Sequence, residues 1–212
     1  MGERLPHHAG VNPIPLPDGP WLYSERLIKA LEAAAVMHAA QRRKGTEIPY
    51  LAHLIGTCAI ALEYGADEDE AIAALLHDAI EDVQPTDGAR AAVASFGERV
   101  LRIVEGCTDT DTHPKPPWRP RKEAYLRHLA EAVASVLLVS AADKLHNARS
   151  VVADLRTSGD AVWERFNGGR DGSLWYYRAL VAAFRANPAH APALIDELDR
   201  TITEMERLAG GR

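Results

Sequence analysis

The sequence has few cysteines, no long apolar run and no surplus of positive charge. Its 212 residues include only two cysteines, Cys58 and Cys107, which excludes a fold held by a network of disulfides and predicts two buried thiols. No apolar run approaches the roughly 20 residues that a membrane helix requires, and the start of the chain has no charged-then-apolar signal. We therefore expect no membrane partner and a cytoplasmic location.

The charge and the pattern of apolar residues exclude two further classes of protein. Lys and Arg total 24 against 30 Asp and Glu, a formal net charge of −6, which argues against general nucleic-acid binding. No stretch alternates between apolar and polar residues next to hairpin turns, as strands typically do. Because 212 residues can bury one substantial core, the sequence predicts an all-α fold with no significant sheet.

Proline marks the first boundary in the chain. Five of the first 20 residues are prolines, and proline disrupts both a regular helix and a central strand. Residues 1–22 are therefore predicted to form an extended or disordered arm, and residues 23–210 a single domain.

Apolar residues recur at helical spacing through this domain, and glycine, proline and capping residues divide it into about eight to ten helices. Ser24 is expected to cap the first helix, and Asp67 with Glu70 the third. The inward face of the first helix is predicted to carry Leu27, Ile28, Leu31, Ala34, Ala35 and His38. Residues 108–120 form one long internal loop. The expected helices cover about residues 24–43, 50–65, 67–82, 86–94, 97–106, 121–129, 132–155, 173–186 and 191–208.

Four polar residues interrupt apolar helical patterns, namely His53, His77, Asp78 and Asp143. Two imidazoles and two carboxylates form a mixed nitrogen and oxygen set that suits Mn²⁺, Fe²⁺ or Zn²⁺. A single histidine on an apolar face is more often a hydrogen-bonded core residue. Burying several acids without a cation is costly, however, and the nearby acids Glu81 and Asp82 favour a metal site with two carboxylates left for chemistry.

The order and spacing of five segments resemble the HD-domain superfamily, and more narrowly the hydrolase domain of RelA/SpoT proteins and the stand-alone small alarmone hydrolases. A lone His-Asp pair would be a weak signal, whereas the five segments together are specific. The segments are Gln41 to Gly45, Pro49 to His53, Ala74 to Asp82, Phe96-Gly97 and Ala142 to Ser150.

The resemblance implies an HD-type helical bundle and an enzyme that removes pyrophosphate from the 3′ position of guanosine tetra- or pentaphosphate, leaving GDP or GTP. It implies one Mn²⁺ held by His53, His77, Asp78 and Asp143, although another divalent transition metal would suit the same ligands. It also implies that Glu81 and Asp82 act on the attacking water. The sequence does not assign base and acid between these two carboxylates.

Six further residues are candidates for contact with the nucleotide. Arg43, Lys44, Asn147 and Ser150 match family positions that do so, whereas Lys144, next to Asp143, could reach a phosphate and Tyr177 could lie beside the phosphates. For the basic pair Arg43 and Lys44, the alternative is a solvated helix end, and for Lys144 it is a surface salt bridge. Asn147 and Ser150 could instead cap or pack a helix. Tyr177 belongs to an aromatic group, residues 163–177, most of which should be core.

Two rival functions remain open at this point. The first is an HD phosphohydrolase for another nucleotide, such as a nucleoside monophosphate or NADPH, and the second is a nucleotide sensor without catalysis. The basic residues Lys115, Arg119, Arg121 and Lys122 would make the long loop positive and could guide a polyanion. An oligomer is compatible with the sequence but is not indicated by it.

Overall fold

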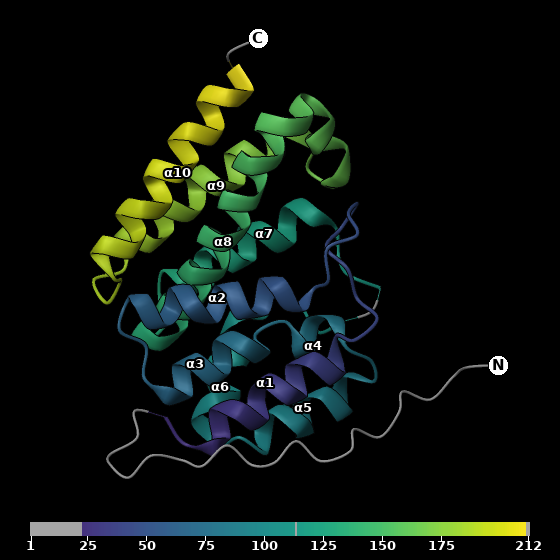
Figure 1. Ribbon diagram of the computed structural model, residues 1–212. Helices are drawn as coiled ribbons and strands as arrows, with labels where there is room; N and C mark the ends of the chain where they lie inside the picture. Colours follow the sequence, from purple (N-terminus) through teal and green to yellow (C-terminus); the bar gives the residue numbers. More distant parts are fainter. Residues whose placement is uncertain (1–22, 113, 211–212) are drawn as a thin grey trace, which may run out of the picture.

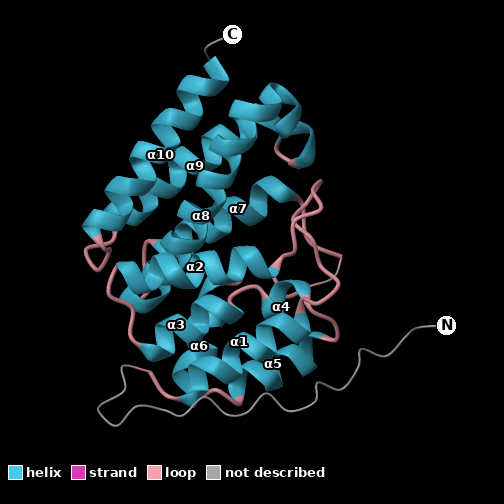
Figure 2. Cartoon of the chain, in the orientation of Figure 1, coloured by secondary structure: helices cyan, strands magenta, loops and turns pink. Residues whose placement is uncertain are grey.

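The computed structural model describes residues 23–112 and 114–210, and every regular element within these ranges is helical (Figure 1). The single β-type pairing in these ranges is an isolated bridge between Arg42 and Pro49. The all-α prediction is therefore confirmed (Figure 2). The predicted arm, residues 1–22, lies outside the described residues. The α-helices are α1 (Glu25–Met37), α2 (Leu51–Glu63), α3 (Glu68–Leu76), α4 (Ala79–Asp82), α5 (Thr86–Ala94), α6 (Glu98–Cys107), α7 (Trp118–Leu129), α8 (Ala134–Ser158), α9 (Gly169–Ala186) and α10 (Pro192–Gly210), and a 3₁₀ helix, η1, spans Gly159–Arg165.

The long helix α8 is the centre of the packing. It contacts α2, α3 and α6 on one side and η1, α9 and α10 on the other, and it passes between these two groups in Figure 1. Its first turns are buried on every face, from Val136 to Ala142. A helix that is apolar all round belongs in a core, so the polar residues that follow in α8 are placed deep inside the molecule.

Local sequence signals set several helix ends as predicted. The Ser24 hydroxyl accepts from the Arg26 amide, 3.2 Å, at the start of α1. At the start of α3, Asp67 and Glu70 form a complete capping box, in which each side chain satisfies the other residue's backbone amide. Gly65, at φ +87°, ends the turn after α2.

The first helix is shorter than predicted. It ends at Met37 rather than near Arg43, because the chain then reverses in a tight turn in which the Arg43 amide donates to the Ile48 carbonyl, 2.8 Å. Gly45 lies in this turn at φ +71°, a conformation that glycine adopts without steric cost. The turn brings the basic residues 42–44 to the side of the molecule where α4 lies (Figure 2).

The face that the first helix buries agrees with the prediction only in part. Ala34 and His38 are buried as predicted, whereas Ile28 and Leu31 are 65% and 40% exposed and Ala30, which was not predicted to face inward, is fully buried. α1 packs against α3, in which three of the six buried residues are alanines. Small side chains on both helices allow a close approach, and the larger residues of α1 remain outside.

The carboxyl-terminal half begins its helices earlier than predicted. α7 starts at Trp118 instead of Arg121, and α9 starts at Gly169 instead of Ser173. The aromatic residues Trp163, Tyr176 and Tyr177 are buried, which confirms their core placement. None of the helices in the described ranges combines the length and the apolar character needed to cross a membrane.

Candidate active site

The His77-Asp78 pair lies at a break between two helices, where the sequence predicted one continuous helix. α3 ends at Leu76 and α4 begins at Ala79. Adjacent residues of a continuous helix do not face each other, and the break allows both side chains to point at one centre. Asp78, with φ −97° and ψ 0°, lies in the sparsely populated bridge region where many active-site residues occur.

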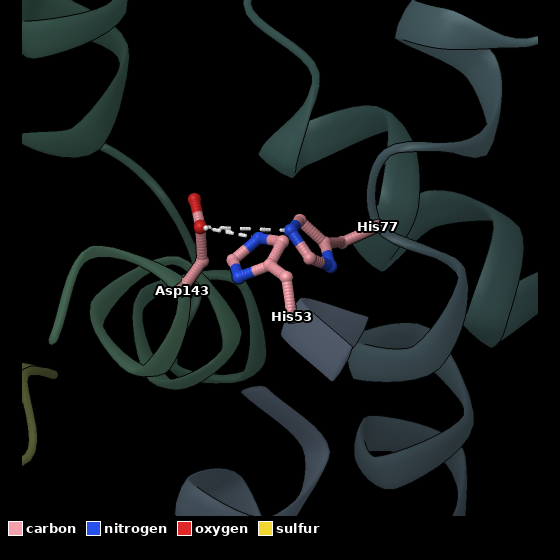
Figure 3. Close-up of side chains that lie close together, drawn as sticks. All are labelled: His53, His77 and Asp143. Carbon is pink, nitrogen blue, oxygen red and sulfur yellow. Dashed lines mark ion pairs between the residues drawn. The ribbon is translucent and has the colours of Figure 1, made fainter. Parts of the chain in front are cut away.

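Four side-chain atoms from α2, the α3–α4 break and α8 converge at this centre. His53 Nε2 lies 3.2 Å from Asp143 Oδ1 and 3.6 Å from Asp78 Oδ2. His77 Nε2 lies 3.0 Å from Asp78 Oδ2 and 3.6 Å from Asp143 Oδ1. Figure 3 shows His53, His77 and Asp143, the group that could hold a metal ion. Ligands about 2.0–2.2 Å from one divalent ion have similar mutual separations.

The hydrogen bonds of both imidazoles leave the Nε2 atoms directed at this centre. His77 Nδ1 lies 2.9 Å from the Ala74 carbonyl oxygen, so Nδ1 carries the proton and Nε2 has the free lone pair. His77 Nε2 is buried and has no hydrogen-bond partner among the described residues. Such a buried, unpaired nitrogen within reach of two carboxylates is what a metal ligand requires, and these residues therefore fit a divalent cation.

His53 is oriented in the same way by a second histidine. Its Nδ1 lies 2.9 Å from Nδ1 of His146. Burial, with the nearby His53 and Arg43, lowers the pKa of His146 to about 4, so His146 is neutral near pH 7 and its Nδ1 can accept the proton. The added Cβ of an alanine at Gly56 would lie 2.3 Å from the His146 ring, and glycine at this position makes the contact possible.

The two remaining acids lie beside the cluster and share one lysine. Lys115 Nζ donates to Glu81 Oε1, 2.8 Å, and to Asp82 Oδ1, 3.0 Å. The other oxygen of Asp82 accepts from Gln41 Nε2, 2.9 Å. Burial, with the nearby Asp109 and Asp78, raises the pKa of Glu81 above its usual range, and Lys115 opposes this rise. The raised pKa makes Glu81 a candidate proton acceptor.

A cavity of about 690 Å³ opens beside these groups, which is within the range of small-molecule sites. Three carboxylates, those of Glu81, Asp82 and Asp154, line it, against a much larger number of cations. Six of these cations pair with carboxylates. Arg43 and Lys44 contact amide oxygens instead, so their charges are the best placed in the wall to attract an anionic ligand. The eight basic residues in the wall are Arg42, Arg43, Lys44, Lys115, Arg121, Lys122, Lys144 and Arg165.

The residues predicted to contact a nucleotide all line this cavity, with different partners. Arg43 Nη2 donates to Asn147 Oδ1, 2.6 Å, and Lys44 Nζ donates to Asn167 Oδ1, 3.0 Å. The Ser150 hydroxyl donates back to the carbonyl of its own helix, as in the packing alternative. Tyr177 also lines the wall.

Lys144 does not form the surface salt bridge that was the alternative for it. Its ammonium group pairs with the buried Asp143 carboxylate. Burial opposes the charged form, but Asp143 holds the pKa of Lys144 well above its usual range. Lys144 therefore neutralises part of the negative charge at the centre.

The predicted positive loop is corrected in part. Lys115 lies in the loop, whereas Arg119 is already in α7. Arg121 and Lys122 lie in this helix, as predicted, and both pair with Asp109. Arg119 pairs with Glu123. These three charges are thus compensated within the fold, and Lys115 is the loop cation that reaches the acids.

Sequence reasoning missed three residues that orient the site. The Tyr50 hydroxyl donates to Asp78 Oδ2, 2.6 Å. Gln41 donates to Asp82, and Asp109 pairs with Arg121 and Lys122. Tyr50 and Gln41 lie in two of the segments that carried the resemblance, which is the signal that could have found them. Nothing local in the sequence marks Asp109.

The family described as HD domain matches residues 30–174. The chain belongs to the HD-domain family. The match spans the helices that supply the clustered histidines and aspartates of this HD domain. It also includes the turn with the basic residues and the start of α9, so the matched segment contains nearly the whole cavity wall.

The curated relatives of this HD domain carry one recurring name. The guanosine-3′,5′-bis(diphosphate) 3′-pyrophosphohydrolase MESH1 of Xenopus tropicalis is 38% identical over 59% of this chain and 69% of its own length. MESH1 of Drosophila melanogaster is 31% identical over 84% of this chain and 94% of its own. A solved metazoan ortholog of SpoT, described as hydrolysing ppGpp, aligns with a TM-score of 0.69 at 28% identity, covering 85% of this chain and 96% of that one.

Proposed function

We propose that this HD domain hydrolyses the 3′-pyrophosphate of guanosine tetra- or pentaphosphate, releasing pyrophosphate and leaving GDP or GTP. The main observation behind the proposal is that one cavity brings together a candidate metal cluster and a group of basic residues. A two-histidine, two-aspartate cluster adjoins the cavity through His53, next to the Glu81–Asp82 pair, and eight basic residues line the walls. The names of the MESH1 relatives support the same reaction.

The metal we propose is one Mn²⁺, held by His53, His77, Asp78 and Asp143. Mixed imidazole and carboxylate donors suit this ion, and the unpaired Nε2 of His77 is available to it. When bound, a divalent ion lowers the pKa of a water molecule and stabilises negative charge on phosphoryl oxygens. Tyr50 and His146 would orient Asp78 and His53 from outside the ligand set.

We propose that Glu81 removes the proton from the attacking water and that Asp82 positions it. Both oxygens of Asp82 already accept hydrogen bonds, from Gln41 and Lys115, which fix the orientation of its carboxylate. Glu81 has the raised pKa that a general base needs near neutral pH. The water oxygen attacks the phosphorus bonded to O3′, and the bond from phosphorus to O3′ breaks. Pyrophosphate is released, and O3′ of the GDP or GTP product takes up a proton from solvent, which balances the proton that Glu81 removed from the water.

The cavity walls provide contacts for the rest of the nucleotide. The residues predicted to contact the nucleotide that line the cavity include Arg43, Lys44, Lys144, Asn147 and Tyr177. The planar guanidinium of Arg43 lies 5.8 Å from the Tyr50 ring centre, and such a group can stack on a base as well as pair with phosphate. We propose that residues 23–210 act as one catalytic domain in the cytoplasm, without nucleic acid or membrane as a partner.

Incubation of the purified protein and Mn²⁺ with guanosine tetraphosphate tests the proposal. We expect GDP and pyrophosphate in equal amounts, separated by anion-exchange chromatography. Release of orthophosphate would contradict the proposed bond cleavage. Turnover of NADPH or of a nucleoside monophosphate in preference to guanosine tetraphosphate would favour the rival phosphohydrolase, and binding without turnover would favour a sensor.

Arg43→Ala should raise KM for guanosine tetraphosphate by roughly tenfold or more and change kcat much less. A hydrogen bond to a charged group contributes about 1.5–3 kcal/mol, and Arg43 lies in the cavity wall rather than at the metal ligands. Steady-state kinetics at saturating Mn²⁺ measure both constants. Arg102→Ala on the exposed face of α6 is the matched control, and an unchanged KM in Arg43→Ala would remove Arg43 from the binding site.

Lys115→Ala should move the acid limb of the pH profile of kcat to higher pH. Glu81 must be ionised to accept a proton, so activity falls as pH drops through its pKa. Burial and neighbouring acids raise this pKa and Lys115 lowers it, so removal of Lys115 raises it further. The profile is measured at saturating substrate, with Lys29→Ala on the exposed side of α1 as the control. A shift to lower pH would contradict this role for Lys115.

A further inference from the structure

The first residue of α7, Trp118, sits on a glycine surface at the start of α9. A Cβ added at Gly168 would lie 2.7 Å from Trp118 Cη2, and one added at Gly172 would lie 3.3 Å from the same ring. The first distance is shorter than a normal contact, so no residue larger than glycine fits at position 168 with Trp118 in place. Gly168 has φ −83°, so the requirement for glycine there is one of space, not of backbone conformation.

Aromatic and basic side chains surround the Trp118 ring where it does not contact the glycines. The Trp118 ring meets Trp175 and Tyr176 edge-on, with ring centres 6.2 Å and 6.1 Å apart, a favourable geometry for aromatic pairs. Arg119 covers the Trp175 ring at 3.3 Å. Trp118 therefore fastens the beginning of α7 to α9, and it also lines the cavity.

Lys115 lies only three residues before Trp118, with Pro116 and Pro117 between them. Proline fixes its own φ angle and restricts the residue before it, so this connection has little freedom. At one end of this connection, Trp118 packs against the start of α9. At the other end, the Lys115 ammonium group bonds to Glu81 and Asp82. Movement of the tryptophan is thus expected to be transmitted to the lysine.

We propose that Trp118, seated on Gly168 and Gly172, is a positioning residue that holds Lys115 at the Glu81–Asp82 pair and at the cavity where pyrophosphate binds. Trp118 acts through Lys115 and not on the reacting atoms. The prediction for the pH profile rests on the proposed function, whereas the prediction for pyrophosphate binding does not require catalysis.

Two perturbations of this contact are compared with removal of the lysine. Trp118→Ala removes the indole ring that packs on Gly168 and Gly172. Gly168→Ala keeps the tryptophan but adds a Cβ that would clash with its ring. Gly88→Ala is the matched control, because the nearest atom to its added Cβ is 3.5 Å away, an ordinary contact. Trp118→Phe keeps an aromatic ring on the glycines and should restore most of the wild-type behaviour. Thermal denaturation checks that each variant is folded.

The first readout is the pH profile of kcat. Trp118→Ala and Gly168→Ala should move the acid limb to higher pH, as Lys115→Ala does, and Trp118→Ala should add no further shift in the Lys115→Ala background. A merely structural role would lower the melting temperature and leave the acid limb in place. That result, or equal shifts from Trp118→Ala in both backgrounds, would overturn the proposal.

The second readout is the affinity for inorganic pyrophosphate in the presence of Mn²⁺, measured by calorimetry. Trp118→Ala and Lys115→Ala should each weaken binding by roughly tenfold, and the double variant should bind no more weakly than Lys115→Ala. Independent sites would instead give the product of the two losses, which would contradict the coupling, as would a wild-type protein that does not bind pyrophosphate. If the wild type binds pyrophosphate but does not hydrolyse guanosine tetraphosphate, the proposed function fails and this cycle still decides the role of Trp118.

Discussion

Glu81→Gln will leave the affinity for Mn²⁺ unchanged and lower kcat by about 100- to 10,000-fold, the usual contribution of a general base. Glutamine has the same shape and can still accept the hydrogen bond from Lys115, but it cannot take a proton from water. Glu81 lies outside the four proposed metal ligands and pairs with Lys115 at 2.8 Å. The substitution therefore separates proton transfer from metal binding.

Both quantities are measured on one preparation, Mn²⁺ binding by electron paramagnetic resonance and turnover by pyrophosphate release. Glu98→Gln, an 83% exposed side chain on α6, makes the same chemical change away from the cavity and should match the wild type. Full turnover in Glu81→Gln would exclude Glu81 as the base. Loss of Mn²⁺ from this variant would show instead that Glu81 holds the metal.

The sequence predicted the fold class well because helical periodicity and capping are local properties. The capping box of Asp67 and Glu70 and the glycine end at Gly65 are each determined within a few residues. The face of α1 was predicted wrongly at Ile28 and Leu31, although Ala34 was placed correctly, and the reason is nonlocal. Hydrophobicity alone favoured Ile28 and Leu31, whereas close packing against α3 selects Ala30 and buries it.

The candidate metal cluster was assembled from four polar interruptions in apolar helices, and the structure brings those atoms together. The break between α3 and α4 was missed, because His77 and Asp78 show no glycine or proline to mark it. The break is nevertheless what directs both adjacent side chains to one point. A functional requirement here overrides the local preference for a continuous helix.

The orienting residues could not be derived from local pattern, because each acts across a long separation in the sequence. Gln41 reaches Asp82 and Lys115 reaches both acids, and these pairings depend on how two loops fold over α4. The loops on that side of the molecule therefore determine the electrostatics of the site (Figure 2). The amino-acid composition of these loops predicted a positive charge, but it did not predict the acids with which that charge pairs.

Asp78→Ala will abolish Mn²⁺ binding at micromolar concentrations and with it all Mn²⁺-dependent hydrolysis. The Oδ2 atom of Asp78 lies 3.0 Å and 3.6 Å from the Nε2 atoms of the two imidazoles, so its loss removes one of the two negative ligands. Changing a residue that only supports a ligand typically costs 10- to 100-fold in affinity, about 1.4–2.7 kcal/mol. Removal of the ligand itself should therefore weaken binding by more than about 100-fold.

Tyr50→Phe supplies the graded comparison, since it deletes only the hydroxyl that donates to Asp78 Oδ2 at 2.6 Å. We expect it to weaken Mn²⁺ binding by about 10- to 100-fold and to regain activity when Mn²⁺ is raised, whereas Asp78→Ala should not. Asp111→Ala, on the exposed loop, controls for loss of a carboxylate elsewhere. Retention of wild-type Mn²⁺ affinity in Asp78→Ala would place the ion away from the α3–α4 break. The geometry predicts that the loss of Mn²⁺ affinity is largest in Asp78→Ala, smaller in Tyr50→Phe and absent in Asp111→Ala. This order tests the whole cluster.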